Sequence, residues 1–151
     1  MKYILLIYGD EHALTETERE QCCEESVELA QDIDSAGHYL AASPLEPTSS
    51  AASVRIRDGK RLVTDGPFAE TREQLGGFFL IEAADLDEAI AIAARIPMAR
   101  RGTVEVRPVR ELSGLPESGT RVVSGKEKHV VSGKGKHAVS DKEKSDLRAR
   151  R

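Results

Sequence analysis

The sequence contains no tryptophan, only two cysteines, and few aromatic residues, which make up 4% of its 151 positions. The two cysteines, Cys22 and Cys23, are adjacent and cannot provide the disulfide framework of a small secreted domain. Successive side chains of a helix point about 100° apart, so we expect free thiols, which are typical of a cytoplasmic protein. A reactive thiol or a metal pair is the alternative. Because no histidine stands at ligand spacing, we predict no metal site.

Long hydrophobic runs are missing as well. No apolar stretch approaches the roughly 20 residues that a membrane span requires. The apolar N-terminal stretch ends at Tyr8 and lacks the flank of a cleaved signal peptide. We therefore predict a cytoplasmic protein that does not contact membranes.

The overall charge of −4 combines two parts of opposite sign. Residues 1–117 contain 12 basic and 22 acidic residues, whereas residues 118–151 contain 10 basic and 4 acidic ones. The second part also contains an eight-residue repeat, which begins at Val122, Val130 and Ala138. We predict a folded domain over 1–117 and a disordered, basic, low-complexity tail over 118–151. The alternative is a tail that contacts polyanions weakly through charge alone.

Hydrophobic periodicity and capping signals predict two helices and six strands. Thr15 and Glu18 form a capping box for a helix that reaches Ala36, and Asp85 and Glu88 form a second one for a helix that ends before Pro97. The expected strands are 3–8, 38–42, 54–57, 60–63, 78–81 and 103–107. The two middle strands form a hairpin around Asp58-Gly59. A two-residue loop would set Ile56 opposite Arg61, and a three-residue loop would set Val54 opposite Leu62.

This order predicts an α+β fold, a ferredoxin-like βαββαβ core with an inserted β-hairpin. Both helices then cover one face of an antiparallel sheet. Strands 3–8 and 78–81 are apolar on both faces, so the second face also needs a cover. We predict a homodimer in which a second copy supplies that cover, sheet against sheet.

One stretch, residues 62–81, carries the strongest local signals. Its first strand must stop at Asp65-Gly66-Pro67, because Pro67 fixes its own φ and restricts the residue before it. Asp65 therefore ends a strand on a rigid turn, where a carboxylate can act as a general acid or base. It can equally serve only to cap its own turn. Gly76-Gly77 is expected to form a hinge before the next strand.

The same stretch carries a family resemblance. The segments DGPFAETREQLGGFFLIEAADLDEA, YILLIYGDE and TVEVRPV resemble the DGPF branch of the YCII-related proteins over about residues 1–112. The resemblance implies a dimeric α+β barrel. It also implies an acid–base site that pairs the Asp near this turn with a His from the first helix, and some relatives are dehydrochlorinases or lyase-like enzymes. The helix at 15–36 contains no histidine, so His38 or His12 would have to replace it.

These observations lead to a predicted function and an alternative. The first is a cofactor-free enzyme, or a binding protein, for a small organic molecule, in which Asp65 transfers a proton with His38 as its partner. The substrate is expected to contact Tyr8, Gly66, Pro67, Phe68 and Arg72. The alternative is a non-catalytic regulatory or interaction protein. DGPF proteins are often encoded beside sigma factors of the extracytoplasmic-function type, so the resemblance implies a sigma factor as partner.

Overall fold

A computed structural model describes residues 1–114 of the chain. The predicted basic tail, residues 118–151, lies outside the described residues, and the boundary at residue 117 stays a prediction. Within the described part, no helix is long and apolar enough to cross a membrane.

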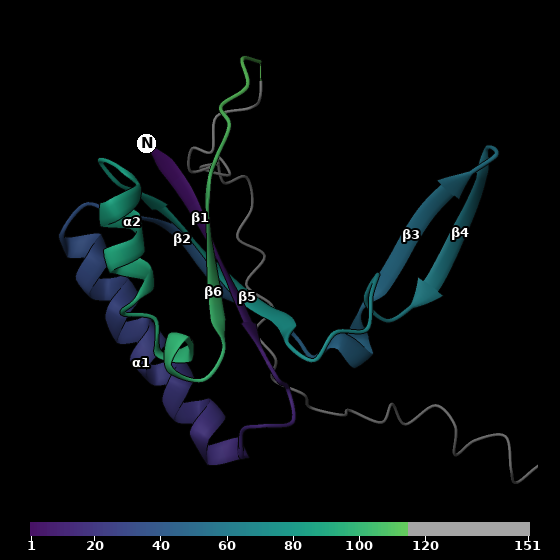
Figure 1. Ribbon diagram of the computed structural model, residues 1–151, viewed down its shortest axis with the longest axis horizontal. Coiled ribbons are helices and arrows are strands. Elements are labelled where there is room, and N and C mark those ends of the chain that lie inside the picture. Colours follow the sequence, from purple (N-terminus) through teal and green to yellow (C-terminus); the bar gives the residue numbers. More distant parts are fainter. Residues whose placement is uncertain (115–151) are drawn as a thin grey trace, which may run out of the picture. The chain divides into compact units, whose positions relative to one another are not determined.

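The core is a four-stranded antiparallel sheet with the strand order β2-β5-β1-β6. Its strands are β1 (Lys2–Gly9), β2 (Tyr39–Pro44), β5 (Gln74–Glu82) and β6 (Thr103–Pro108). The two helices, α1 (Glu16–Ser35) and α2 (Leu86–Ala93), lie on the same face of the sheet (Figure 1). This connectivity is the predicted ferredoxin-like βαββαβ core, and β6 occupies one edge of the sheet, as its alternating charges indicate.

Local sequence signals determine where α1 begins and ends. The Thr15 hydroxyl accepts a hydrogen bond from the Glu18 N–H, and the Glu18 carboxylate accepts one from the Thr15 N–H, which completes the predicted capping box. Gly37 takes a φ of 81° just after the helix. The N–H of Gly37 then bonds to Asp34 and that of His38 to Ile33, which closes the C-terminal turn.

The second helix is shorter than predicted. It ends at Ala93 rather than near Ile96, and the 3-10 turn η2 (Pro97–Arg100) follows. Asp85 caps it as predicted, but the Glu88 carboxylate bonds to the Ala84 N–H instead of returning to Asp85. The buried stripe contains Ala89, Ile92, Ala93 and Ile96, whereas Leu86 and Ile90 are about half exposed.

The hydrophobic core lies between the helices and the sheet. Leu5, Ile81, Ile33 and Ile96 are its most completely buried side chains. Alternate residues of β1 and β5 point to the opposite side of the sheet. We call this side the open sheet face and define it by Ile4, Leu6, Phe78 and Leu80, which are only partly buried. The prediction that the sheet is apolar on both faces is therefore confirmed.

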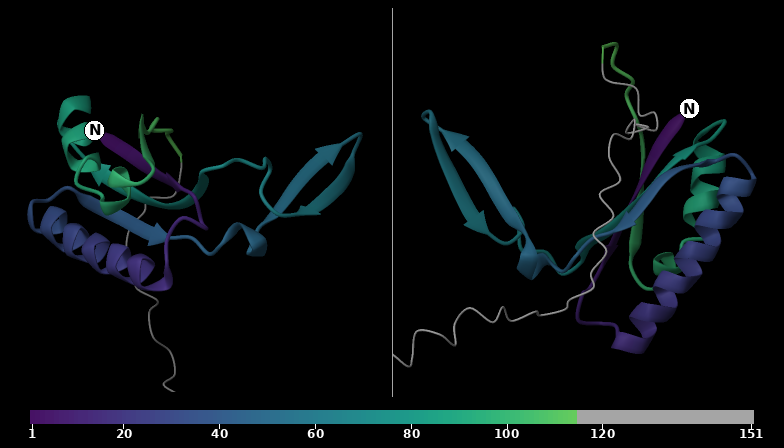
Figure 2. Two further views of the ribbon diagram at one scale, coloured as in Figure 1. Left: turned by 60° about the horizontal axis from the view of Figure 1, so that its bottom comes forward. Right: turned by 180° about the vertical axis from the view of Figure 1, so that it is seen from behind.

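The inserted hairpin forms a second sheet of its own, from β3 (Ala52–Arg57) and β4 (Lys60–Asp65). We call residues 52–65 the hairpin arm; it extends away from the helices, beyond the end of the core sheet (Figures 1 and 2). Ile56 pairs with Arg61, so the two-residue alternative for the loop is correct. Asp58 and Gly59 both have positive φ, 50° and 71°, as a tight hairpin turn requires. The short 3-10 turn η1 (Thr48–Ser50) precedes the arm.

The predicted hinge at Gly76-Gly77 is wrong, because both glycines lie inside β5. The register shifts between Ile7, which faces Gly77, and Tyr8, which faces Leu75, so Gly76 is the extra residue of a bulge. A side chain at Gly77 would place its Cβ only 3.0 Å from the Ser43 carbonyl oxygen on β2. Close approach of neighbouring strands, rather than flexibility, therefore explains these glycines.

Candidate functional site

A groove of about 930 Å³ runs between α1 and the β2 side of the core sheet. We call it the helix–sheet groove. Its walls are mainly apolar, and they include Ile7, Ala30, Tyr39, Ala42, Phe79 and Met98. Val27 of α1, which is 57% exposed, also lines it. Apolar side chains around a concave surface of this size are typical of a site for a small organic molecule.

Small residues create this space. Cys22, Ser26 and Ala30 follow one another at four-residue intervals on the face of α1 that lines the groove. The Ser26 hydroxyl donates to the Cys22 carbonyl oxygen at 2.7 Å, so it is satisfied within its own helix. On the sheet, Ala42 and Gly77 line the same space. Short side chains on both walls leave a gap that longer ones would fill.

Arg19 is the one basic residue that lines the groove. Its Nη2 donates to the backbone oxygen of Glu11 at 3.2 Å, while its Nε is buried and has no hydrogen-bond partner within residues 1–114. The Glu11 carboxylate accepts instead from the Thr48 N–H at 2.7 Å and the Thr48 hydroxyl at 2.9 Å. A buried donor without a partner is costly, and an oxygen acceptor on a ligand would remove that cost.

Several carboxylates surround the groove and affect which ligand would suit it. The acidic lining residues are Asp10, Glu11, Glu16, Asp34 and Glu46, and Arg19 is the one basic residue among the lining. This excess of negative charge disfavours a strongly anionic ligand. An uncharged, mainly apolar molecule therefore suits this lining better than an anion.

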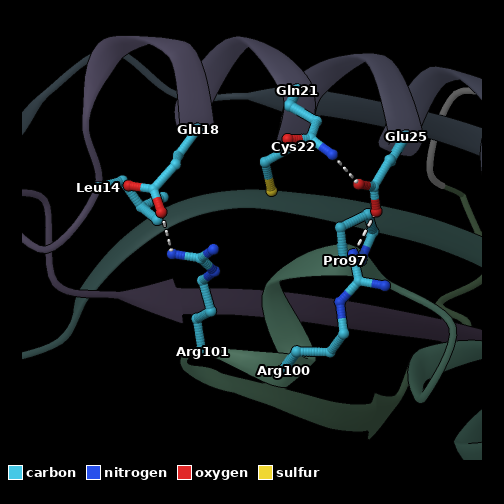
Figure 3. Close-up of a pocket in the computed structure, with 8 residues that line it drawn as sticks. All are labelled: Leu14, Glu18, Gln21, Cys22, Glu25, Pro97, Arg100 and Arg101. Atoms are coloured by element: carbon cyan, nitrogen blue, oxygen red, sulfur yellow. Dashed lines mark hydrogen bonds and ion pairs between the residues drawn. The ribbon is translucent and has the colours of Figure 1, made fainter.

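A smaller pocket of about 320 Å³ lies between α1 and η2 (Figure 3). Arg101 binds Glu18 at 2.8 Å, and Arg100 pairs with Glu25, which also accepts from Gln21. Hydrogen bonds from the Thr15 backbone, Arg101 and the Thr15 hydroxyl lower the pKa of Glu18 to about 2. Because its charges already pair with each other, this pocket attaches η2 to α1 and offers a ligand little.

The same pocket contains Cys22. Burial, with the neighbouring Cys23 and Glu25, raises the pKa of the Cys22 thiol, which disfavours the reactive thiolate. Among residues 1–114, no three His, Cys, Asp or Glu side chains gather closely enough to hold a metal ion.

The predicted site residues of the turn Asp65-Gly66-Pro67-Phe68 are neighbours in the sequence and therefore in space. None of them lines either pocket, and neither does Arg72. Asp65 ends β4 with an exposed side chain. Gly66 has a φ of 93°, and its N–H donates to the Ala51 oxygen at 2.7 Å, which closes the base of the hairpin arm. Phe68 is 82% exposed, and Pro67 and Arg72 are exposed as well.

His38 lies at the other end of β2. Its Nδ1 is 2.8 Å from the Glu82 carbonyl oxygen, and its Nε2 is 3.8 Å from the Glu88 carboxylate. The six residues of β2, about 20 Å of extended chain, separate His38 from the segment that leads to the hairpin arm. Tyr8 is partly buried near the end of β1. Within one chain, His38 and Asp65 are therefore not brought together, and their catalytic roles stay predictions.

Sequence reasoning missed Arg19, although the sequence holds a signal for it. Arg19 is the single basic residue of α1, which contains eight acidic ones. A lone basic residue in such a helix suggests a specific partner. No comparable signal pointed to the bond between Glu11 and Thr48, which depends on how the segments after β1 and β2 meet.

Two sequence comparisons show which proteins this chain resembles. The YCII-related domain family matches residues 1–113. An uncharacterised protein of Rhizobium meliloti (strain 1021) is 40% identical over 114 residues, which cover 72% of this chain and 92% of the relative.

Among solved structures, one similar chain is the 5-chloro-2-hydroxyhydroquinone dehydrochlorinase TftG of Burkholderia phenoliruptrix AC1100, in complex with 2,5-dihydroxybenzoquinone. It shares 12% identity, with a TM-score of 0.45, over 73% of this chain and 94% of that one. A structural likeness this weak supports no conclusion about function. The match to the domain family and the 40% identical relative are sufficient by themselves: this chain belongs to the YCII-related family.

Proposed function

We propose that this protein binds a small, mainly apolar organic molecule in the helix–sheet groove and that Arg19 donates a hydrogen bond to an oxygen of that molecule. The observation that carries the proposal is the buried Nε of Arg19, which has no partner within residues 1–114 and belongs to a side chain that lines the groove. A hydrogen bond to a charged donor contributes about 1.5–3 kcal/mol, so the acceptor oxygen should improve affinity about 10- to 100-fold.

The sharpest test compares ligands that differ only in that oxygen. Acetophenone and ethylbenzene have similar size and shape, but only acetophenone carries a carbonyl group. Titration of the isotope-labelled protein, followed by two-dimensional NMR, should show shifts at groove residues such as Tyr39 and Met98 with both ligands. Acetophenone should bind at least tenfold more tightly. Benzoate, as a third ligand, measures how strongly the surrounding carboxylates repel an anion.

A matched pair of variants assigns the effect to Arg19. Arg19→Met keeps an apolar side chain of similar length and should reduce acetophenone binding to the ethylbenzene level. Arg95→Met removes an arginine that pairs with Asp32 and does not line the groove, so it should change neither affinity. Equal affinities of the two ligands for the unmodified protein, or shifts confined to residues outside the groove, would refute the proposal.

Independently of ligand binding in the groove, we predict that Asp65 takes part in catalysis. An exposed carboxylate has no environment that favours proton transfer, so a role for Asp65 requires another molecule to cover it. We propose a second copy of the chain, paired through the open sheet face, as this cover. Asp65→Asn should then abolish turnover of a substrate without changing the folded state. A sigma factor as partner stays a prediction, and a pull-down that survives Asp65→Asn would favour that regulatory alternative.

A further inference from the structure

The hairpin arm exposes several large apolar side chains to solvent. Val54, Ile56 and Val63 are 62%, 59% and 58% exposed, and every residue of β3 and β4 except Ser53 is exposed. A two-stranded hairpin alone is marginally stable in water. These residues therefore suggest a surface that another molecule covers.

The strand register gathers this apolar surface on one face. Val54 lies opposite Val63, Ile56 opposite Arg61, and Ala52 opposite Asp65. Opposed residues of antiparallel strands share a face, and so do residues two positions apart. We call this set of six the apolar face of the hairpin arm; it includes Asp65 at the base. Leu62 and Arg55 occupy the other face.

The base of the hairpin arm is well anchored. The Gly66 N–H bonds to the Ala51 oxygen, and the Ser53 hydroxyl donates to the Gly66 oxygen at 2.8 Å. The η1 turn just before the arm is bonded through Thr48 to the Glu11 carboxylate. Such an element is partly ordered before it meets a partner, which lowers the entropic cost of binding.

Charge favours a second copy of this chain as the partner. The hairpin arm contains four basic and two acidic residues, a net charge of +2. We call the rest of residues 1–114 the body; it contains eight basic and nineteen acidic residues, a net charge of −11. The arm of one copy is therefore attracted to the body of another. The open sheet face provides an apolar surface for the arm to cover.

We infer that, in a two-fold pair, the hairpin arm of each copy packs its apolar face against the open sheet face of the other. This inference rests on the pairing put forward under the proposed function and goes beyond it, because it assigns the arm as the element that holds the pair together. It also places Asp65 at the boundary between two copies, so that the partner contributes to the predicted acid–base site.

Sedimentation of the full chain over a concentration series tests this arrangement. The bond between Gly66 and Ala51 brings the ends of the arm together, so residues 52–65 can be replaced by Asn-Gly, a loop that suits a two-residue turn. The buried core lies entirely outside these residues, so the shortened chain should fold. We expect a dimer for the full chain and at least a tenfold rise in the dissociation constant after excision.

Two point variants identify the face involved. Val63→Lys adds a charge to the apolar face and should weaken the dimer at least tenfold. Leu62→Lys makes an equivalent change on the opposite face and should alter the constant less than twofold. A full chain that is monomeric at 100 μM overturns the pairing and the inference together. A shortened chain that pairs as tightly as the full chain, or two lysine variants with equal effects, overturns the role of the arm alone. Neither result affects ligand binding in the groove, which NMR reports separately.

Discussion

The central strand β5 and the hairpin strand β4 have similar chemistry but very different surroundings. In β5, Phe79 and Ile81 are 4% and 0% exposed, because the helices cover that face. In β4, Leu62 and Val63 are 49% and 58% exposed, since no element of residues 1–114 covers them. Burying a large aliphatic side chain contributes about 1.5–3 kcal/mol. The core sheet thus gains stability within one chain, whereas the hairpin arm would gain it from the proposed second copy.

Two isoleucines in strands provide the most direct test of this difference. Ile81→Ala should lower the free energy of unfolding by about 2–5 kcal/mol, because it leaves a cavity in the core. Ile56→Ala, on the exposed hairpin arm, should lower it by less than about 0.5 kcal/mol. Urea unfolding followed by circular dichroism, at protein concentrations where the chain is monomeric, measures both. Similar losses for the two variants would show that the hairpin arm packs within its own chain.

Local signals predicted most of the fold. The Thr15 capping box, the Gly37 terminus and the Asp58-Gly59 turn each depend on hydrogen bonds or backbone angles within a few residues, and the structure contains all three. The unbroken apolar runs of β1 and β5 predicted a sheet with two apolar faces. The order of elements then left few topologies, and the ferredoxin-like one is correct.

Features that depend on tertiary contacts were not predictable in this way. Gly76-Gly77 looked like a hinge, because the sequence cannot show that the Ser43 carbonyl oxygen lies against Gly77. The helix–sheet groove arises where small residues of α1 meet small residues of two strands, a meeting that no single segment encodes. The sequence also could not show that the Asp65 side chain is exposed within one chain, and its role stays a prediction.

Two glycines extend the comparison to the backbone. A Cβ at Gly102, just before β6, would lie 2.1 Å from the Tyr8 carbonyl oxygen, so Gly102→Ala must displace the core sheet. Overpacking of this kind costs about 1–3 kcal/mol, and the urea midpoint should fall. At Gly59 nothing lies within 4 Å of the added Cβ, and only the positive φ opposes an alanine. That conformation costs about 1–2 kcal/mol.

The two variants should therefore change hydrogen exchange in different parts of the protein. Gly59→Ala should speed hydrogen exchange at amides of the hairpin arm and leave the urea midpoint of the body unchanged. Gly102→Ala should affect exchange throughout the core sheet. A fall in the urea midpoint with Gly59→Ala would mean that the hairpin arm and the body unfold as one unit.

The smallest expected effect concerns pH and a carboxylate of the body. The pKa of Glu18 is about 2 in the folded protein, below the value of roughly 4.3 for an unfolded chain. Its contribution to stability is thus present above pH ~4.3 and is lost as the pH falls towards 2. Glu18→Gln should be less stable than the unmodified protein above pH 5, and the difference should shrink on acidification. Glu70→Gln, an exposed change beyond the hairpin arm, should follow the unmodified protein at every pH. Parallel curves for Glu18→Gln would show that Arg101 and the Thr15 cap do not hold this carboxylate in solution.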